Sequence, residues 1–216
     1  RRFLSYMPAN NGVLPPEYDL VEDAAQEQDD ILEILPERQA KVYDMRKIIE
    51  IIVDKGSFFE FKPRFGKSGT VGLARLNGKS VGIVANNPQF GGGALSQEAC
   101  RKIIDFQVMC DSFNIPIVRF MDTPGFVVGT EAERKGAPGW IMNFMNSSCL
   151  VTVPSITVIV RKAYGRAYVA MGGGRHNDEM IAWPTAEVSF MDPNFATSIV
   201  HGVDIGEEGF EDALAD

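Results

Sequence analysis

Residues 156–171 read ITVIVRKAYGRAYVAM, and this stretch decides the fold class. Ile156–Val160 is a continuous run of β-branched residues, which predicts a buried strand. Gly165 permits a sharp turn after the strand, and the residues from Arg166 to about Met171 favour a short helix. A buried strand that passes directly into a helix is typical of an α/β domain.

The start of this short helix is a candidate site for a negatively charged oxygen. The first N–H groups of a helix lack intrahelical acceptors, and the helix dipole favours negative charge at that end. The backbone N–H groups of Arg166 and Ala167 are therefore candidate oxyanion-hole donors, with Gly165 forming the turn before them. Spacing alone favours the plainer alternative, a strand-to-helix turn packed by glycine, because such turns are common.

The same alternation of strands and helices extends along the chain. Asn77-Gly78 predicts a hairpin turn, because both residues tolerate positive φ. The other predicted strands are Phe58–Phe65, Thr70–Leu76, Lys79–Ala85, Ile117–Asp122 and Ala186–Phe190. The other predicted helices are one capped by Asp44 and ended by Gly56, one from Ser96 to Ser112, one with Pro138 in its first turn, and Asn194–Val200. We therefore expect one α/β domain over residues 43–216, rather than a sandwich or a bundle.

Residues 1–42 differ from this pattern. Prolines interrupt the segment at Pro8, Pro15, Pro16 and Pro36. An acidic run fills its middle, formed by Asp19, Glu22, Asp23, Glu27, Asp29, Asp30, Glu33 and Glu37. We expect an acidic linker or arm that contains one short helix and exposes a solvated surface.

The charge of the chain restricts its partners. The 216 residues carry a formal charge of −8 with a pI near 4.9, and 45% of them are hydrophobic. Nucleic acids and anionic membranes both need a basic face, so we expect neither as a partner. A local basic patch can still bind phosphate groups, so coenzyme A stays open. No apolar run reaches membrane-spanning length, and the N-terminus has no signal-peptide pattern.

Common catalytic side-chain patterns are missing. Cys100, Cys110 and Cys149 have no CxxC spacing, so we expect buried free thiols in a reducing cytoplasm. His176 and His201 lack metal-ligand spacing, and no metal site or Cys/His nucleophile pair is expected. A mechanism that uses backbone donors and a base supplied by a cofactor agrees with these absences.

Two more loops follow predicted strands. Asn86–Leu95 reads NNPQFGGGAL, and it favours either a flexible loop or the close approach of a planar ligand to glycine backbone. Its broken GxGxxG pattern is too weak to predict a dinucleotide site. Asp122–Gly129 reads DTPGFVVG at the carboxyl end of a buried strand, where α/β sheets bind ligands. A capped Pro-Gly turn is an equally good interpretation of this second loop.

Several of these segments resemble one known family. The segments that carry the resemblance are RKAYGRAYVAM (161–171), AWPTAEVSFM (182–191), YDMRKIIEIIVDKGSFFEF (43–61), VGIVANNP (81–88), CDSFNIPIVRFMDTPGFVVGT (110–130) and RRFLSYMPANN (1–11). Taken in their order along the chain, these segments are similar to the C-terminal half of the carboxyltransferase β subunit of biotin-dependent acyl-CoA carboxylases. The resemblance covers nearly the whole chain up to about His201.

The resemblance implies a crotonase-like ββα spiral fold and a composite active site. It implies that the N-terminal half is absent here, so that this chain alone is inactive. The N-terminal half of a partner subunit would hold acyl-CoA, and this half would hold biotin. Carboxybiotin would break down to carbon dioxide and a biotin enolate, whose N1 removes the α-proton of the thioester. The thioester enolate would then attack carbon dioxide.

The resemblance also implies roles for particular residues. It assigns the biotin-side oxyanion hole to the backbone N–H groups of Arg166 and Ala167. We expect biotin contacts from two loops, namely Gly92, Gly93, Ala94 and Leu95, and Thr123, Pro124 and Gly125. We expect Tyr168 and Val169 to line the acyl pocket.

Four departures from the family pattern indicate an atypical subgroup with an unassigned acyl substrate. Arg166 stands where the family usually has a second glycine, and Val169 replaces a residue that is often acidic. RKGAPGW (134–140) replaces the usual GxxxxGAK helix start, and Ser96 replaces an aspartate.

The implied partners are a biotin carboxylase, a biotin carboxyl carrier and further copies of the same subunit. The implied location is the cytoplasm, or the mitochondrial matrix in a eukaryote. Three alternatives remain: a biotin-dependent decarboxylase subunit, a crotonase-like hydratase or isomerase that uses Glu131 and Glu133 as acid and base, and a non-catalytic assembly module.

Overall fold

Seven strands form one mixed sheet in the computed structural model, which describes residues 1–19, 30–174, 176–203, 205–207 and 209–215. The strands are β1 (Phe59–Phe61), β2 (Gly69–Leu76), β3 (Lys79–Asn86), β4 (Ile117–Thr123), β5 (Ser155–Tyr164), β6 (Glu179–Ala182) and β7 (Glu187–Ser189). β1, β2 and β3 pair antiparallel, and the parallel pairs continue through β4, β5 and β6. β7 pairs with the far end of β5.

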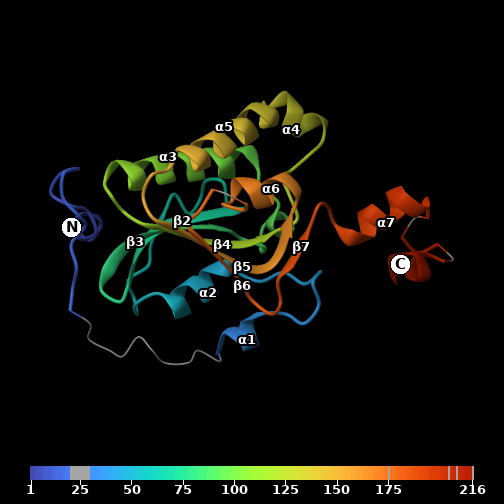
Figure 1. The fold of residues 1–216 in the computed structure, drawn as a ribbon, viewed down its shortest axis with the longest axis horizontal. Helices are drawn as coiled ribbons and strands as arrows, with labels where there is room; N and C mark the ends of the chain where they lie inside the picture. The colour runs from blue at the N-terminus through green and yellow to red at the C-terminus, as the bar shows by residue number, and fades with distance from the viewer. Residues whose placement is uncertain (20–29, 175, 204, 208, 216) are drawn as a thin grey trace.

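Helices cover both faces of the sheet (Figure 1). The helices are α1 (Asp30–Ile34), α2 (Met45–Ile52), α3 (Gln97–Ser112), α4 (Thr130–Arg134), α5 (Ala137–Leu150), α6 (Gly165–Ala170), α7 (Pro193–His201) and α8 (Phe210–Ala215), with short 3-10 turns at η1 (Phe3–Ser5) and η2 (Gly91–Gly93). The core on one face includes Ile103, Phe106 and Phe144 from α3 and α5. The core on the other face includes Ile48 and Ile49 from α2. This layering confirms the predicted α/β class.

Local sequence signals placed most elements correctly. Asn77 and Gly78 adopt positive φ values of 52° and 76° and close the β2–β3 hairpin, as predicted. The side chain of Ser96 accepts a hydrogen bond from the N–H of Ala99 and caps α3, and Asp44 caps α2 through Arg46. These caps satisfy donors that a helix start would otherwise leave without acceptors.

Two predicted boundaries were wrong. The strand predicted over Phe58–Phe65 is limited to β1, because Lys62 and Gly66 take positive φ and turn the chain. α2 ends before Gly56, because Val53 is extended (φ −84°, ψ 161°). Gly56 instead lies in the next turn, where its φ is 69°. The sequence signals did not predict α4, β6 or α8.

The amino-terminal arm packs on the sheet instead of extending freely. Tyr6 is 1% exposed, and its hydroxyl donates to the carbonyl of Ser57. The guanidinium of Arg75 lies 4.3 Å from the ring centre of Tyr6 and 4.2 Å from that of Tyr18. Both aromatic residues precede the acidic run. They attach the arm to the sheet, which the charge pattern of the arm did not predict. Residues 20–29, which hold four of the eight acidic residues of that run, lie outside the described residues.

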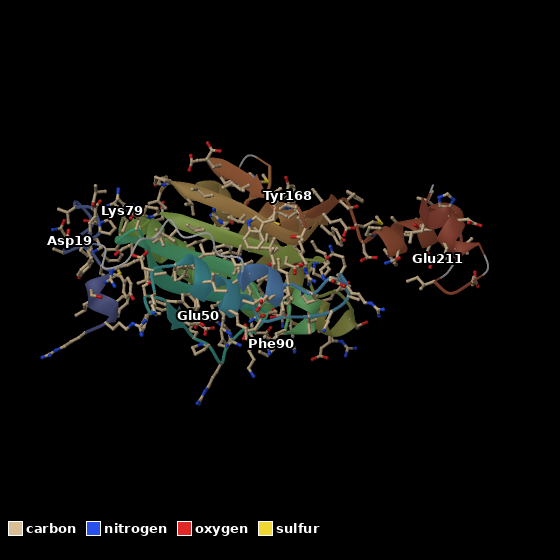
Figure 2. The ribbon with its side chains drawn as sticks, turned by 90° about the horizontal axis from the view of Figure 1, so that it is seen from below. Asp19, Glu50, Lys79, Phe90, Tyr168 and Glu211 are labelled. Atoms are coloured by element: carbon tan, nitrogen blue, oxygen red, sulfur yellow. The ribbon has the colours of Figure 1, made fainter. Side chains whose placement is uncertain are left out.

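The carboxyl-terminal segment lies apart from the sheet. Figures 1 and 2 show α7 and Glu211 of α8 at one end of the molecule, and Lys79 at the opposite end. Phe195, Ile199 and Val200 of α7 are 60%, 59% and 75% exposed. α7 confirms the helix predicted at Asn194–Val200. Its exposed apolar side chains do not join either core.

Candidate active site

The carboxyl ends of β3, β4 and β5 bring the three predicted site segments to one edge of the sheet. η2 follows β3, the Thr123-Pro124-Gly125 turn ends β4, and Gly165 follows β5. Backbone hydrogen bonds join the first two loops, since the N–H of Leu95 donates to Gly125 and the N–H of Val127 donates to Leu95. Thr123 pairs with Ala163, two residues before Gly165.

Asn86 fixes the first two loops against each other. Its Oδ1 accepts from the N–H of Asp122 at 2.8 Å, and its Nδ2 donates to the carbonyls of Asp122 and Gly93. The hydroxyl of Thr123 also donates to the carbonyl of Gly93, at 2.9 Å. Asn86, Asp122 and Thr123 are completely buried. Buried polar groups that satisfy each other in this way hold a single loop geometry.

Asp122 extends this network to β5. Its Oδ2 accepts from Nε of Arg161 at 2.8 Å, and its Oδ1 accepts from the N–H of Lys162 at 3.1 Å. A bulge makes the contact possible, because four residue steps of β5 from Ile159 to Ala163 oppose two steps of β4. Such extra residues redirect a side chain at the end of a strand. Asp122 thus joins the three strand ends: its backbone binds Asn86 at the end of β3, and its carboxylate binds the end of β5.

Arg161 also connects the site edge to the arm. Its terminal nitrogens donate to the carbonyl of Lys41 at 3.2 Å, and its guanidinium lies 4.8 Å from the ring centre of Tyr43. Burial, followed by the charge of Asp122, raises the pKa of the Tyr43 hydroxyl far above its usual range. Tyr43 therefore stays neutral, and its ring packs against the guanidinium of Arg161.

The start of α6 has the geometry of a strained glycine turn. Gly165 has a φ of 57°, and a Cβ there would lie 3.0 Å from the carbonyl oxygen of Phe190. The backbone enters the helix at Gly165, as the sequence predicted. Arg166 is exposed and Ala167 is fully buried, so the helix start faces solvent on the side of Arg166.

The residues predicted to bind biotin divide into open and buried positions. A Cβ built at Gly92 or Gly125 would meet no heavy atom within 4 Å. At Gly93, a Cβ would lie 2.5 Å from the carbonyl oxygen of Asp122. Leu95 and Thr123 are also buried, whereas Ala94 and Pro124 are partly exposed. Open glycine backbone gives a planar ligand room, and the buried positions support it.

Tyr168 and Val169 lie on the later part of α6. The Tyr168 hydroxyl lies 3.7 Å from the sulfur of Met180 and accepts from the N–H of Gly174 at 3.3 Å. These contacts of Tyr168 lie in β6 and in the segment before it, and Val169 is partly exposed. Their placement in an acyl pocket stays a prediction.

Glu131 and Glu133 lie outside this edge network, in α4. Glu131 is exposed and forms an ion pair of 2.9 Å with Lys135. Its hydrogen bond with Lys135 lowers the pKa of the carboxyl, which is the wrong direction for a general acid. This arrangement argues against the hydratase interpretation.

One prediction about cysteine was wrong. Cys100 and Cys110 are buried free thiols, but Cys149 is exposed, with its sulfur 3.3 Å from Nδ1 of His176. The sequence hid this contact because 27 residues separate the two side chains. The described residues contain no group of three acidic, His or Cys side chains suited to a metal. Within the same ranges, every helix is too short or too polar to span a bilayer.

The buried polar residues that the sequence did not predict include Asn86, Arg119 and Arg161. Each stands in or at the end of an apolar strand, and a polar or charged side chain in such a strand is a usable signal. Arg119 differs from the others, because none of its three guanidinium nitrogens has a hydrogen-bond partner among the described residues.

Known proteins resemble this chain in sequence. Residues 1–211 match the family described as the carboxyl transferase domain. The chain is 41% identical over its full length to a propionyl-CoA carboxylase carboxyltransferase subunit of Haloferax mediterranei, and spans 42% of that protein. It is 38% identical over 95% of its length to the methylmalonyl-CoA decarboxylase subunit alpha of Propionigenium modestum, and spans 40% of it.

A solved relative extends the comparison to structure. The transcarboxylase 12S hexamer, solved with methylmalonyl-CoA bound, superposes with a TM-score of 0.92 at 34% identity, over 99% of this chain and 42% of the other. The chain therefore spans about two fifths of the relatives that it matches. Its fold is the crotonase-like fold of carboxyltransferase domains. This chain belongs to the carboxyl transferase domain family.

Proposed function

We propose that this chain forms the biotin-facing half of an acyl-CoA carboxyltransferase, which moves a carboxyl group from carboxybiotin to the α-carbon of an acyl-CoA. One observation carries the proposal: the Asn86–Asp122–Arg161 network joins the ends of β3, β4 and β5, which lead into the three predicted site segments. A site built on buried, mutually satisfied groups is held in advance of binding, as catalysis by positioning requires.

The chain's own residues would supply donors and shape rather than an acid or a base. When bound, carboxybiotin supplies the carboxyl group and a ureido nitrogen that accepts the α-proton. The N–H groups of Arg166 and Ala167 would hold the negative oxygen of the ureido group. The open backbone at Gly92 and Gly125 suits a flat bicyclic ring, because no side chain fills the space above either glycine.

The proposal requires partners outside this chain. The acyl-CoA site would lie on the N-terminal half of a partner subunit, so that the two reactants meet between subunits. Further copies of the subunit, a biotin carboxylase and a biotinylated carrier complete the proposed assembly. The hexameric transcarboxylase 12S supports an oligomer of this kind.

Changing the turn at Gly165 tests the site without removing a side chain. Gly165→Ala adds a Cβ at positive φ and 3.0 Å from the carbonyl of Phe190, so the helix start must shift. Losing one oxyanion donor typically costs about 2.7–4 kcal/mol, so we expect turnover of a subunit with both halves to fall by about 100- to 1000-fold. Gly139→Ala is the control, since a Cβ there meets nothing within 4 Å.

Two further variants separate backbone from side chain. Ala167→Pro removes one amide and should lower turnover as strongly, provided that circular dichroism shows a folded protein. Arg166→Gly keeps the amide, so it should leave turnover within a few-fold of the unchanged enzyme. A fully active Gly165→Ala would place the hole elsewhere, and an inactive Arg166→Gly would make the guanidinium a catalytic group.

A decarboxylase subunit is the second candidate, because two relatives at 38% identity are methylmalonyl-CoA decarboxylase alpha subunits. The same loops would then run the transfer in reverse. Isolation of the subunit with a membrane-embedded partner would favour the decarboxylase. Isolation with a biotin carboxylase would favour the carboxylase.

A further inference from the structure

The loop between β1 and β2 exposes a concentration of positive charge on an otherwise acidic chain. Lys62, Arg64 and Lys67 are exposed in this loop, and Arg101 of α3 is exposed beside it. The whole chain has a formal charge of −8. Among the described residues, neither Arg64 nor Lys67 forms an ion pair, whereas Lys62 pairs with Asp105.

Buried contacts hold this basic loop (residues 62–68) in place. Lys102 is 1% exposed, and its Nζ donates to the carbonyls of Phe65 at 2.7 Å and Lys62 at 3.4 Å. A Cβ at Gly66 would lie 2.7 Å from backbone atoms of α3, so the loop touches that helix directly. An ordered loop presents its cations at fixed positions, which lowers the entropic cost of binding a partner.

The basic loop is also joined to the proposed biotin loop. The hydroxyl of Ser68 accepts from the N–H of Ser96, and the carbonyl of Ser68 accepts from the N–H of Asn87. Nζ of Lys67 lies 5.6 Å from the ring centre of Phe90, which Figure 2 labels. The two loops therefore form one continuous surface.

A cavity of about 250 Å³ opens in this surface, lined by Lys62, Phe65 and Arg101. It combines two cations with an aromatic ring that is 38% exposed. Such a lining suits a carboxylate-bearing side chain that enters from a partner.

The sheet places the basic loop at the edge that carries the site. Gly69 begins β2 opposite Asn86 at the end of β3, so residues 62–68 lie at the carboxyl end of the parallel strands. Three strand spacings separate β2 from β5, which is about 14 Å. A group tethered to a partner that sits on the basic loop can therefore reach across η2 toward α6.

We propose that the basic loop docks the biotinylated carrier protein through an acidic surface of that carrier. The inference rests on the proposed function, because carboxybiotin would arrive attached to a carrier and not as a free molecule. The carrier must settle beside the biotin loops, and the surface there has the opposite sign to the chain as a whole. An acidic carrier would be repelled by most of this chain and attracted here, which orients its approach.

Charge reversal in the complete carboxyltransferase tests the docking. Arg64→Glu with Lys67→Glu should raise KM for the biotinylated carrier at least tenfold at low salt, with kcat nearly unchanged. The reverse transfer, in which a carboxylated acyl-CoA gives its carboxyl group to free biotin and is left as acyl-CoA, should keep its rate, because free biotin needs no carrier surface. The matched control is Lys47→Glu with Lys55→Glu, which changes the net charge equally at exposed residues outside the loop.

The outcomes separate the docking from the proposed function. An unchanged carrier KM, or an equal rise in the control, would overturn the docking, as would an equal loss with free biotin. A rise in KM for acyl-CoA alone would make the basic loop a nucleotide-phosphate site and would also overturn it. If the unchanged enzyme transfers carboxyl groups with neither carrier nor free biotin present, biotin is not its carboxyl carrier. That result would overturn the proposed function itself, independently of the docking.

Discussion

Two buried arginines on neighbouring strands face different surroundings. Arg161 of β5 is 1% exposed and lies on the side of the arm, where Asp122 and the carbonyl of Lys41 accept its hydrogen bonds. Arg119 of β4 is completely buried near Cys110 and Gly172, with no hydrogen-bond partner among the described residues. Burial lowers the pKa of Arg119 to about 10, and the partly opposing charges nearby do not reverse this.

The difference shows what makes a buried charge useful. A buried ion removed from water is costly unless well-placed partners replace the water. Around Arg161 the partners are Asp122 at the end of β4 and backbone carbonyls of the arm, so the charge joins the edge of the sheet to the arm. Around Arg119 no such gain is visible, so the charge chiefly opposes folding. Stability measurements can break or sharpen this contrast.

Removing the partner of Arg161 should have the largest effect. Asp122→Ala leaves the guanidinium buried without its carboxylate, so we expect the free energy of unfolding to fall by about 3–5 kcal/mol. Urea denaturation of the chain measures the change. The control is Asp105→Ala, which breaks an exposed pair with Lys62 and should cost about 1 kcal/mol or less. Equal losses would show that burial does not distinguish the two carboxylates.

Replacing Arg119 should act in the opposite direction. Arg119→Met removes a buried, unpartnered charge and keeps most of the volume, so we expect a gain of about 1–4 kcal/mol in the same denaturation. Arg161→Met is the matched comparison, and it should destabilise the chain because it leaves the buried Asp122 with only the longer ion pair to Lys162, at 3.9 Å. A loss on Arg119→Met would mean that Arg119 has a partner in solution, and the contrast would disappear.

The arginines also show what the sequence could predict. Ser96, Asn77-Gly78 and the run at Ile156–Val160 act through neighbours in the chain, so their helix cap, hairpin and strand followed from sequence. The Asp122–Arg161 contact depends on a bulge in β5 and on the pairing of two strands. No local pattern encodes that register, so the sequence could indicate the candidate loops at this edge but not the network that joins them. The anchoring of the arm by Tyr6 was hidden for the same reason.

Lys102 supplies a smaller test, because it is buried like Arg119 but has two carbonyl acceptors. Burial lowers its pKa from 10.5 to about 8, with Arg46 and Lys62 acting in the same direction and Glu60 opposing them. Between those values the unfolded chain holds a proton that the folded chain has released. The free energy of unfolding should therefore rise with pH from about 8 to 10.5, by at most about 1.4 kcal/mol per pH unit.

Lys102→Met should remove that rise, and unfolding curves at pH 7, 8, 9 and 10 would measure the slope. Lys67→Met is the control, since Lys67 is exposed in the same loop and its loss should leave the slope unchanged. An unchanged slope in Lys102→Met would mean that the two carbonyls replace water fully. Lys102 would then resemble Arg161 rather than Arg119, and backbone acceptors alone would be enough to make a buried cation acceptable.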